Sequence, residues 1–244
     1  MLAAVDVGTV LAMKALYLAV IRFYASSIGK KMIVALSALG LLAFLLGHLA
    51  GNLLIFSGPD ALNAYAAKLH GLGVFLWVPR LGLLGLVGVH IMATLHLAAQ
   101  NRAARPQEYV ADATLRATRS SRMMVLSGLT ILAFIVYHLL HFTVGNLHGF
   151  HDDNGAYRLA DGSMNVYKMM VVAFGVWFNS LFYLVALTLL GSHLSHGVSS
   201  LFQTLGFTTP RTRPLYTLVG RLFAVAICGG FASIPVAVLA GFLK

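Results

Sequence analysis

Long apolar stretches alternate with short polar ones along this chain. A helix needs roughly 20 apolar residues to cross a hydrocarbon core of about 30 Å. Five stretches reach that length, at residues 32–56, 79–100, 123–145, 169–203 and 215–241. The pattern therefore predicts an all-α fold, an integral membrane bundle of five transmembrane helices.

The N-terminal stretch, residues 1–25, is apolar as well but carries Asp6, Lys14 and Arg22. Their spacing lets a helix keep all three near water, which is typical of a helix in the membrane interface; a sixth span is the alternative. The basic region and the small-residue cleavage site of a signal peptide are both missing. We therefore divide the chain into an interfacial segment, 1–25, and a transmembrane domain, 26–244.

Composition and charge agree with a membrane location. Of the 244 residues, 59% are hydrophobic and 10% are charged, and the mean hydropathy is +0.85, whereas a soluble domain carries about 25% charged residues. The net charge is +10, and most Lys and Arg residues lie near the N-terminus, in 101–122 or in 204–221. Because short cytoplasmic loops collect basic residues, we expect the N-terminus inside and the C-terminus outside. This bias explains the net charge without a nucleic-acid partner.

Most histidines of the chain fall within the predicted spans. The single cysteine, Cys228, excludes a disulfide framework, a paired-cysteine metal site and a covalent haem attachment motif. An ionisable group inside a bilayer is costly and points to a function, and neutral imidazole is a good axial ligand for haem iron. The histidines in the spans are His48, His90, His96, His138, His141, His193 and His196.

Depth in the membrane pairs four of these histidines. His48 follows Lys31 by 17 residues and His138 follows Arg122 by 16, so both lie roughly 25 Å from the inner face. Two ligands on facing helices at one depth can clamp a haem in a bundle core. The pair His48/His138 therefore predicts one haem on the outer side.

The second and fourth spans run in the opposite direction and give a second pair. His90 precedes Arg102 by 12 residues and His193 precedes Leu205 by 12, so each lies about 18 Å from the inner end of its helix. The pair His90/His193 predicts a second haem, nearer the inside. Any single histidine could instead bond a carbonyl of a neighbouring helix, but matched depths in four spans favour haem ligation.

Three further histidines follow a predicted ligand along the same span. His96, His141 and His196 come six, three and three residues after it. A spacing of three places two side chains on one helix face, which suits a contact with a haem propionate, a quinone contact or plain packing. Each is also the alternative ligand in its span.

Five stretches resemble, in their order and spacing, the cytochrome b membrane anchor of succinate:quinone oxidoreductases, in its single-subunit, five-helix, two-haem form. They are SSIGKK, GHLAGNLLIFSGPDALNAYA, VHIMATLHLAAQNRAARP, FIVYHLLHFTVGN and HLSHGVSSLFQTLGF. The resemblance covers nearly all of residues 26–241. It implies one ligand from each of the first four spans, and it favours His90, His138 and His193 over the histidines that follow them.

The resemblance also implies a function and partners. The chain would carry two haem b groups and pass electrons between the iron–sulfur subunit of a succinate dehydrogenase or fumarate reductase and a membrane quinone, menaquinone. Its partners would be that subunit, a flavoprotein with covalently attached FAD and the lipid of a prokaryotic inner membrane, in a complex that could form a higher oligomer. Some members of this family carry a glutamate beside the ligand in the fourth span, where it is proposed to conduct protons. Here the neighbours of His193 and His196 are Leu194 and Ser195, and the only glutamate of the chain, Glu108, is in a predicted cytoplasmic loop. The sequence therefore does not support such a proton path.

Two pairs of residues are candidates for quinone chemistry. Ser27 and Lys31 lie four apart on one helix face and resemble the serine-then-basic pattern at the quinone site of related anchors, although Ser26 or Ser27 could equally cap the helix. Asp60 and His70 follow the first span on the outer side. His70 falls where some relatives carry an acidic residue implicated in quinone chemistry, and it could transfer protons there or be a surface residue.

Two other classes of membrane protein gather histidines on helices. A histidine-box oxygenase clusters them at one membrane face to hold paired iron, whereas these histidines are predicted at two depths. A proton-coupled transporter could use buried histidines as a relay, but it would not bind haem.

Overall fold

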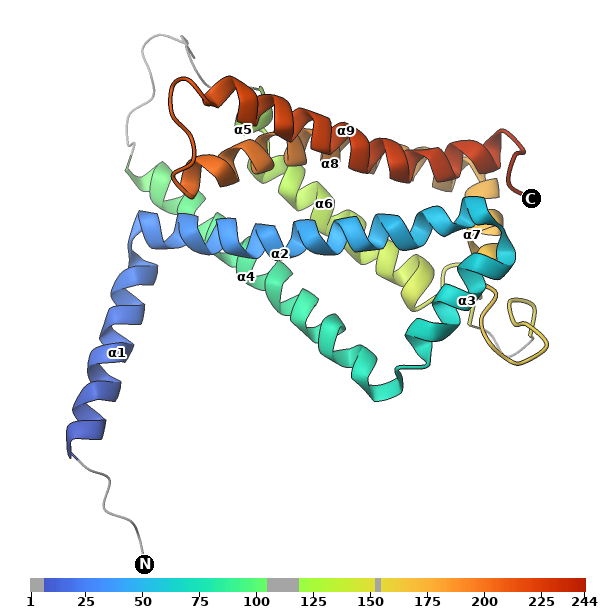
Figure 1. Ribbon diagram of the computed structural model, residues 1–244, viewed down its shortest axis with the longest axis horizontal. Helices are drawn as coiled ribbons and strands as arrows, with labels where there is room; N and C mark the ends of the chain where they lie inside the picture. The colour runs from blue at the N-terminus through green and yellow to red at the C-terminus, as the bar shows by residue number, and fades with distance from the viewer. Residues whose placement is uncertain (1–6, 105–118, 152–154) are drawn as a thin grey trace, which may run out of the picture.

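The computed structural model describes residues 7–104, 119–151 and 155–244 (Figure 1). Within these ranges the chain is helical apart from turns and one isolated antiparallel bridge. The helices are α1 (Val7–Ala25), α2 (Ser27–Leu53), α3 (Pro59–His70), α4 (Trp77–Ala103), α5 (Arg119–Arg122), α6 (Met124–His138), α7 (Val166–Gly175), α8 (Trp177–Thr204) and α9 (Arg213–Leu239). The single-turn segments are η1 (Leu54–Ser57), η2 (Gly73–Leu76) and the π-helical turn η3 (Leu139–Thr143).

Six of the helical segments in the described ranges are long and apolar enough to cross a membrane. This confirms the all-α class, and the length and composition of these helices are consistent with a membrane bundle. Four of the segments match predicted spans, the fifth, Trp177–Thr204, covers only the later part of the predicted span 169–203, and the sixth is α1. Length and composition therefore do not separate an interfacial α1 from a sixth span. Asp6, which entered that prediction, and Glu108 lie outside the described residues.

The bundle has two ends of different chemistry. One end of the bundle holds the starts of α2, α6 and α9 and the end of α4 (Figure 1). It carries Lys31, Arg102, Arg122 and Arg213 and is called the basic end below. α3 and α7 lie at the opposite end, called the α3–α7 end. Both ends are needed to place the histidines, because the predicted pairs lie at different heights between them.

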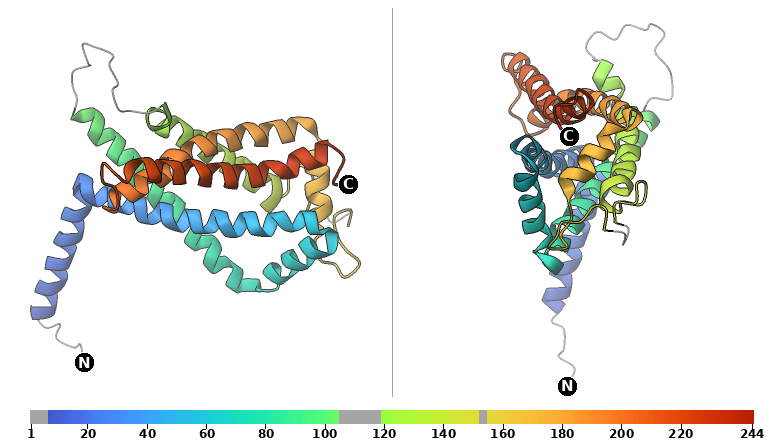
Figure 2. Two further views of the ribbon diagram at one scale, coloured as in Figure 1. Left: turned by 45° about the horizontal axis from the view of Figure 1, so that its top comes forward. Right: turned by 90° about the vertical axis from the view of Figure 1, so that its right-hand side faces the viewer.

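The basic end is organised by the cap of α2. The Ser26 hydroxyl accepts a hydrogen bond from the backbone N–H of Gly29 at 2.9 Å, which satisfies one of the donors left free at a helix start. α1 then leaves the bundle across the direction of α2, as Figures 1 and 2 show from three sides. No residue of Gly8–Ala25 is buried.

The last turn of α1 is tied to the ends of α2 and α4. Tyr24 Oη lies 2.6 Å from His96 Nδ1, and the Gln100 amide donates to the carbonyl of Ala25 at 3.3 Å. The ammonium of Lys30, which is buried, donates to the same carbonyl at 3.0 Å and lies 5.1 Å from the centroid of the Tyr24 ring. These contacts fix where α1 leaves the bundle.

The predicted continuous span 169–203 is wrong. The helix breaks at Val176, whose backbone is extended (φ −76°, ψ 108°), so α7 lies across the α3–α7 end and α8 runs the length of the bundle (Figure 1). Carbonyls freed by the break are bonded by side chains from the first turn of α8. Asn179 donates to the carbonyl of Ala173 at 3.0 Å, and Ser180 donates to that of Phe174 at 2.6 Å.

Packing is closest between α8 and α9 and between α2 and α4. Gly220 permits the first of these contacts, because a Cβ there would lie 2.6 Å from the carbonyl oxygen of Ser195. Buried apolar side chains form a cluster at the α3–α7 end around Ile55, Phe174 and Tyr183. Many large apolar side chains elsewhere are exposed, as expected for surfaces that face lipid.

Candidate functional site

The structure brings His48 of α2 and His138 of α6 together. Their ring centroids lie 5.9 Å apart with the ring planes at 85°. An imidazole nitrogen binds a first-row metal at about 2 Å, so two rings on opposite sides of one metal have centroids roughly 6 Å apart. The observed spacing fits that requirement.

His90 of α4 and His193 of α8 are the two ligands of the second predicted pair. Each has a serine of a different helix at its Nδ1. Ser37 Oγ of α2 lies 3.2 Å from His90 Nδ1, and Ser127 Oγ of α6 lies 3.1 Å from His193 Nδ1. Four helices therefore contribute to this site.

These two serines lie at the same nitrogen of each histidine. Ser37 Oγ is also 2.7 Å from the carbonyl of Ile33, and Ser127 Oγ is 3.2 Å from that of Met124. A hydroxyl has one proton to donate, so a serine that gives its proton to the carbonyl would accept from the histidine Nδ1–H. In that tautomer the Nε2 lone pair of both histidines would be available to a metal, as in sites with an outer-shell partner.

Two glycines lie near His193 in space or in sequence. A Cβ added at Gly128 of α6 would meet His193 Cε1 at 3.6 Å, and one added at Gly197, one turn along α8, would meet nothing within 4 Å. Imidazole donors on facing helices suit the axial positions of a haem, so the donor set fits that group.

The His48/His138 pair has different partners. Tyr183 Oη lies 3.3 Å from His138 Nδ1 and 2.9 Å from His141 Nδ1. A tyrosine hydroxyl can donate to one of these and accept from the other. At His48 the neighbour is the Asn52 amide nitrogen, 3.4 Å from Nδ1, which donates to the carbonyl of His48 at 2.7 Å. The Nδ1 of His48 therefore has an amide nitrogen beside it, whereas the Nδ1 of His138 has a hydroxyl.

His141 lies on the π-helical turn and is completely buried. Its ring centroid is 4.7 Å from that of His148, which lies beyond the end of the predicted span 123–145. The Asn179 amide nitrogen lies 3.1 Å from His148 Nε2, and Asn179 Oδ1 accepts from Tyr137 at 3.3 Å. A buried polar network therefore extends from the predicted ligand His138 to the connection after α6.

Two atoms of this network are buried without a partner among the described residues, His141 Nε2 and His148 Nδ1. Buried polar atoms are normally paired with protein or ordered water. The sequence named His141 but gave no sign of Tyr183, Asn179 or His148. The only signal in the sequence is the spacing of the histidines. His141 follows His138 by three residues and His148 follows His141 by seven, which would place all three on one face of a continuous helix.

The alternative ligands lie in other environments. His96 is exposed, and its Nδ1 is 2.6 Å from Tyr24 Oη of α1, so it joins α1 to α4. His196 is half-buried on α8, one turn from His193. Within the described residues, neither alternative has the serine contact at Nδ1 that His90 and His193 have.

The structure does not bring the quinone candidates into one polar site. Ser27 and Lys31 are both exposed, and Ser26 is the helix cap, which answers the capping alternative; Lys30 is the buried lysine. Asp60 and His70 sit in the first and last turns of α3, about 15 Å apart along its axis. The His70 ring bonds the carbonyl of Ala66 at 2.9 Å and is exposed.

The connection between η3 and α7 includes one perturbed carboxylate outside the spans. Asp161 accepts hydrogen bonds from the backbone N–H of Ser163 at 2.9 Å and from its hydroxyl at 2.7 Å. These bonds hold the pKa of Asp161 below its usual range. They shape an exposed turn, and Asp161 has no contact with the histidine pairs.

Comparison with protein-family models, with curated proteins and with solved structures finds no match to this chain. Within the described ranges no group of three or more His, Cys, Asp or Glu side chains is placed to hold a metal ion. The candidate site therefore rests on its own geometry: the close approach of His48 and His138, and the serine contacts of His90 and His193.

Proposed function

We propose that this chain is a dihaem cytochrome b that passes electrons through the membrane between an iron–sulfur protein and a quinone. The observation that carries the proposal is the close approach of His48 and His138 on facing helices, with ring centroids 5.9 Å apart. His90 and His193 support it, because the serine near each of them lies at Nδ1 and leaves Nε2 for a ligand. A haem bound there supplies one-electron transfer. The chain's own residues position the ligands and keep water away from them.

The second haem would lie between His48 and His138, nearer the α3–α7 end. Two haems stacked in one bundle give electrons a route between its two ends. The resemblance to the anchors of succinate dehydrogenase and fumarate reductase supports an iron–sulfur subunit and an FAD flavoprotein as partners, with menaquinone as the lipid-soluble carrier. The basic end is the surface that we assign to the soluble subunits.

The place of α1 forms part of this proposal. α1 crosses the direction of α2, carries Lys14 and Arg22 and buries no side chain in the bundle. A helix of that kind at the inner end of a bundle fits in the interface plane, in the cytoplasmic leaflet of a prokaryotic inner membrane. We propose that arrangement, with five spans and an external C-terminus.

The test is haem quantitation. The purified chain should show a b-type reduced-minus-oxidised spectrum, and pyridine haemochrome should give two haems per chain. His90→Ala or His193→Ala should remove one haem, because a six-coordinate haem cannot keep its low-spin state without one ligand. His96→Ala, a histidine on the same helix as His90, should keep both. A preparation without haem would refute the proposal.

A proton-coupled transporter is the second candidate. The observation that favours it is the buried network of Tyr183, His141, His148 and Asn179, in which two nitrogen atoms have no partner among the described residues. Buried histidine chains are typical of proton relays in membrane proteins. The same spectrum decides between the two candidates, since a transporter would purify colourless.

A further inference from the structure

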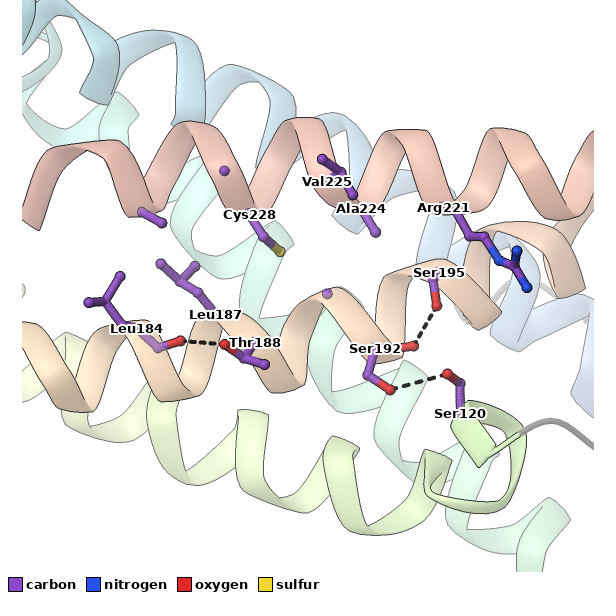
Figure 3. Close-up of a pocket in the computed structure, with 13 residues that line it drawn as sticks. Ser120, Leu184, Leu187, Thr188, Ser192, Ser195, Arg221, Ala224, Val225 and Cys228 are labelled. Carbon is purple, nitrogen blue, oxygen red and sulfur yellow. Dashed lines mark hydrogen bonds between the residues drawn. The ribbon is translucent and has the colours of Figure 1, made fainter. Parts of the chain in front are cut away.

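A groove of about 670 Å³ runs between α8 and α9 and is bordered by the short helix α5 (Figure 3). Its two ends differ. Arg221, Ser120, Ser192 and Ser195 lie together at one end, whereas the rest is lined by apolar and small residues such as Leu187. It lies outside the two histidine pairs, which makes it a separate site.

Arg221 lies deeper than the other basic residues of α9. It follows the first residue, Arg213, by eight positions, which places its Cα about 12 Å along the helix from the basic end. An arginine at that depth in a membrane helix is costly unless its charge is matched. No hydrogen bond or ion pair to Arg221 is formed within residues 7–104, 119–151 and 155–244.

The guanidinium group of Arg221 points back toward the start of α9. Helical side chains tilt toward the N-terminus, and Figure 3 shows the side chain running away from Cys228 and past Ser195. This direction brings the charge toward the membrane surface at the basic end, as arginine side chains do near helix ends. The five N–H donors of the guanidinium remain available to a ligand at that level.

Ser120 adds a hydroxyl donor beside them. Ser192 donates to Ser120 Oγ at 3.2 Å, and Ser195 donates to the carbonyl of Ser192 at 3.0 Å. Ser120 accepts one of these bonds, and its own proton is left for another acceptor. The polar end of the groove therefore offers a fixed cation and a hydroxyl donor, which is the chemistry that recognises a phosphate.

The apolar part of the groove has the length of a lipid chain in one leaflet. From Arg221 to Ala232, both of which line it, α9 rises about 16 Å, close to half of a hydrocarbon core of about 30 Å. Small side chains, among them Gly191 and Gly229, leave the groove open along this length. A phosphate at Arg221 would therefore continue into an acyl chain lying between α8 and α9.

We propose that this groove binds an anionic phospholipid, with its phosphate on Arg221 and Ser120 and an acyl chain along α8 and α9. A basic pocket between membrane helices near the cytoplasmic face is the recurrent setting for anionic headgroups. Charge selects this occupant over a quinone, because a neutral carbonyl would leave the arginine without a counter-ion. The inference goes beyond the proposed electron transfer and does not depend on it.

Native mass spectrometry of the full chain in mild detergent tests the proposal, with phosphatidylglycerol and phosphatidylcholine as probes. Phosphatidylglycerol should bind more tightly, and Arg221→Gln should weaken it roughly tenfold or more, because hydrogen bonds to charged groups are the strong class. Arg213→Gln is the matched control, since it removes an equal charge from the same helix outside the groove and should bind as the wild type does. Equal binding of both lipids, or unchanged binding in Arg221→Gln, would overturn the proposal.

A second measurement locates the lipid. Cys228 lines the groove and is the only cysteine of the chain, so N-ethylmaleimide reports on its accessibility. Phosphatidylglycerol should slow alkylation of Cys228 in the wild type. It should not do so in Gly229→Leu, because the leucine side chain fills the groove. Ala226→Leu, on the exposed surface of α9, is the control and should behave as the wild type does. Protection by menaquinone instead of phosphatidylglycerol would assign the groove to a quinone and refute the lipid.

Discussion

Single hydrogen bonds decide how the candidate ligands can act. Ser37 and Ser127 each bond a carbonyl of their own helix and lie at Nδ1 of a histidine, so that Nε2 of His90 and of His193 is the nitrogen left for a ligand. The partner at Nδ1 also orients the ring. Nothing in the sequence distinguishes these two serines from others, because serines that bond a carbonyl one turn away in their own helix are common in membrane helices.

Removing these partners should weaken the site near the basic end. Ser127→Ala or Ser37→Ala is expected to lower the affinity for that haem roughly tenfold, the lower end of what loss of an outer-shell partner costs at a metal site, and to shift its midpoint potential. Haem retention during dialysis and a redox titration measure the two effects. Ser233→Ala is the control, because Ser233 bonds the carbonyl of Gly230 in its own helix; an equal loss there would show a general packing defect.

Tyr183 links the predicted ligand His138 to the buried His141. Tyr183→Phe keeps the ring and removes the hydroxyl from both Nδ1 atoms, so we expect the haem nearer the α3–α7 end to shift in potential and to bind less tightly. The other haem should keep its potential. Tyr137→Phe, which loses a bond to Asn179, should leave both potentials unchanged, and a shift of the wrong haem would reject the assignment of His138.

The sequence was sufficient to predict that His48 and His138 lie together but not to predict their surroundings. Counting residues from basic helix ends paired His48 with His138, and the structure brings these rings together. Depth along an axis is set by the helical rise alone, so it can be read from spacing. Which side chain of another helix meets Nδ1 depends on helix rotation and crossing, which spacing does not determine; Tyr183 and Ser127 were missed for that reason.

At the scale of helices, hydrophobic length predicted the spans and missed their internal breaks. Residues 169–203 are apolar throughout, yet the chain divides at Val176 because Asn179 and Ser180 bond carbonyls that α7 leaves free. The segment after α2 lies outside the predicted spans and forms the helix α3, which begins at Pro59. Apolar stretches indicate which residues are removed from water, whereas side-chain hydrogen bonds to the backbone determine where a helix ends.

The break between α7 and α8 should therefore depend on those two side chains. Asn179→Ala or Ser180→Ala leaves a buried carbonyl unpaired, which costs about 1–3 kcal/mol and should lower the thermal unfolding temperature measured in detergent. Thr188→Ala is the control on the same helix, because Thr188 is exposed and bonds the carbonyl of Leu184 one turn away. Equal stability of all three variants would show that the break does not depend on these bonds.

At the scale of the whole molecule, charge distinguishes the two ends of the bundle. Lys31, Arg102 and Arg122 are exposed at the basic end, with further arginines in the segment 105–118, outside the described residues. Such a surface steers association with an acidic partner, and this electrostatic attraction weakens as the salt concentration rises.

Reversing Lys31, Arg102 and Arg122 together to Glu should therefore lower the amount of flavoprotein and iron–sulfur subunit that co-purifies with the chain at low ionic strength. Raising the salt concentration should reduce the difference between variant and wild type. Reversal of Lys68 and Lys168 at the α3–α7 end is the control and should leave co-purification unchanged. If the triple variant retained its partners in full, these residues would serve membrane orientation alone, and the docking surface would have to lie elsewhere.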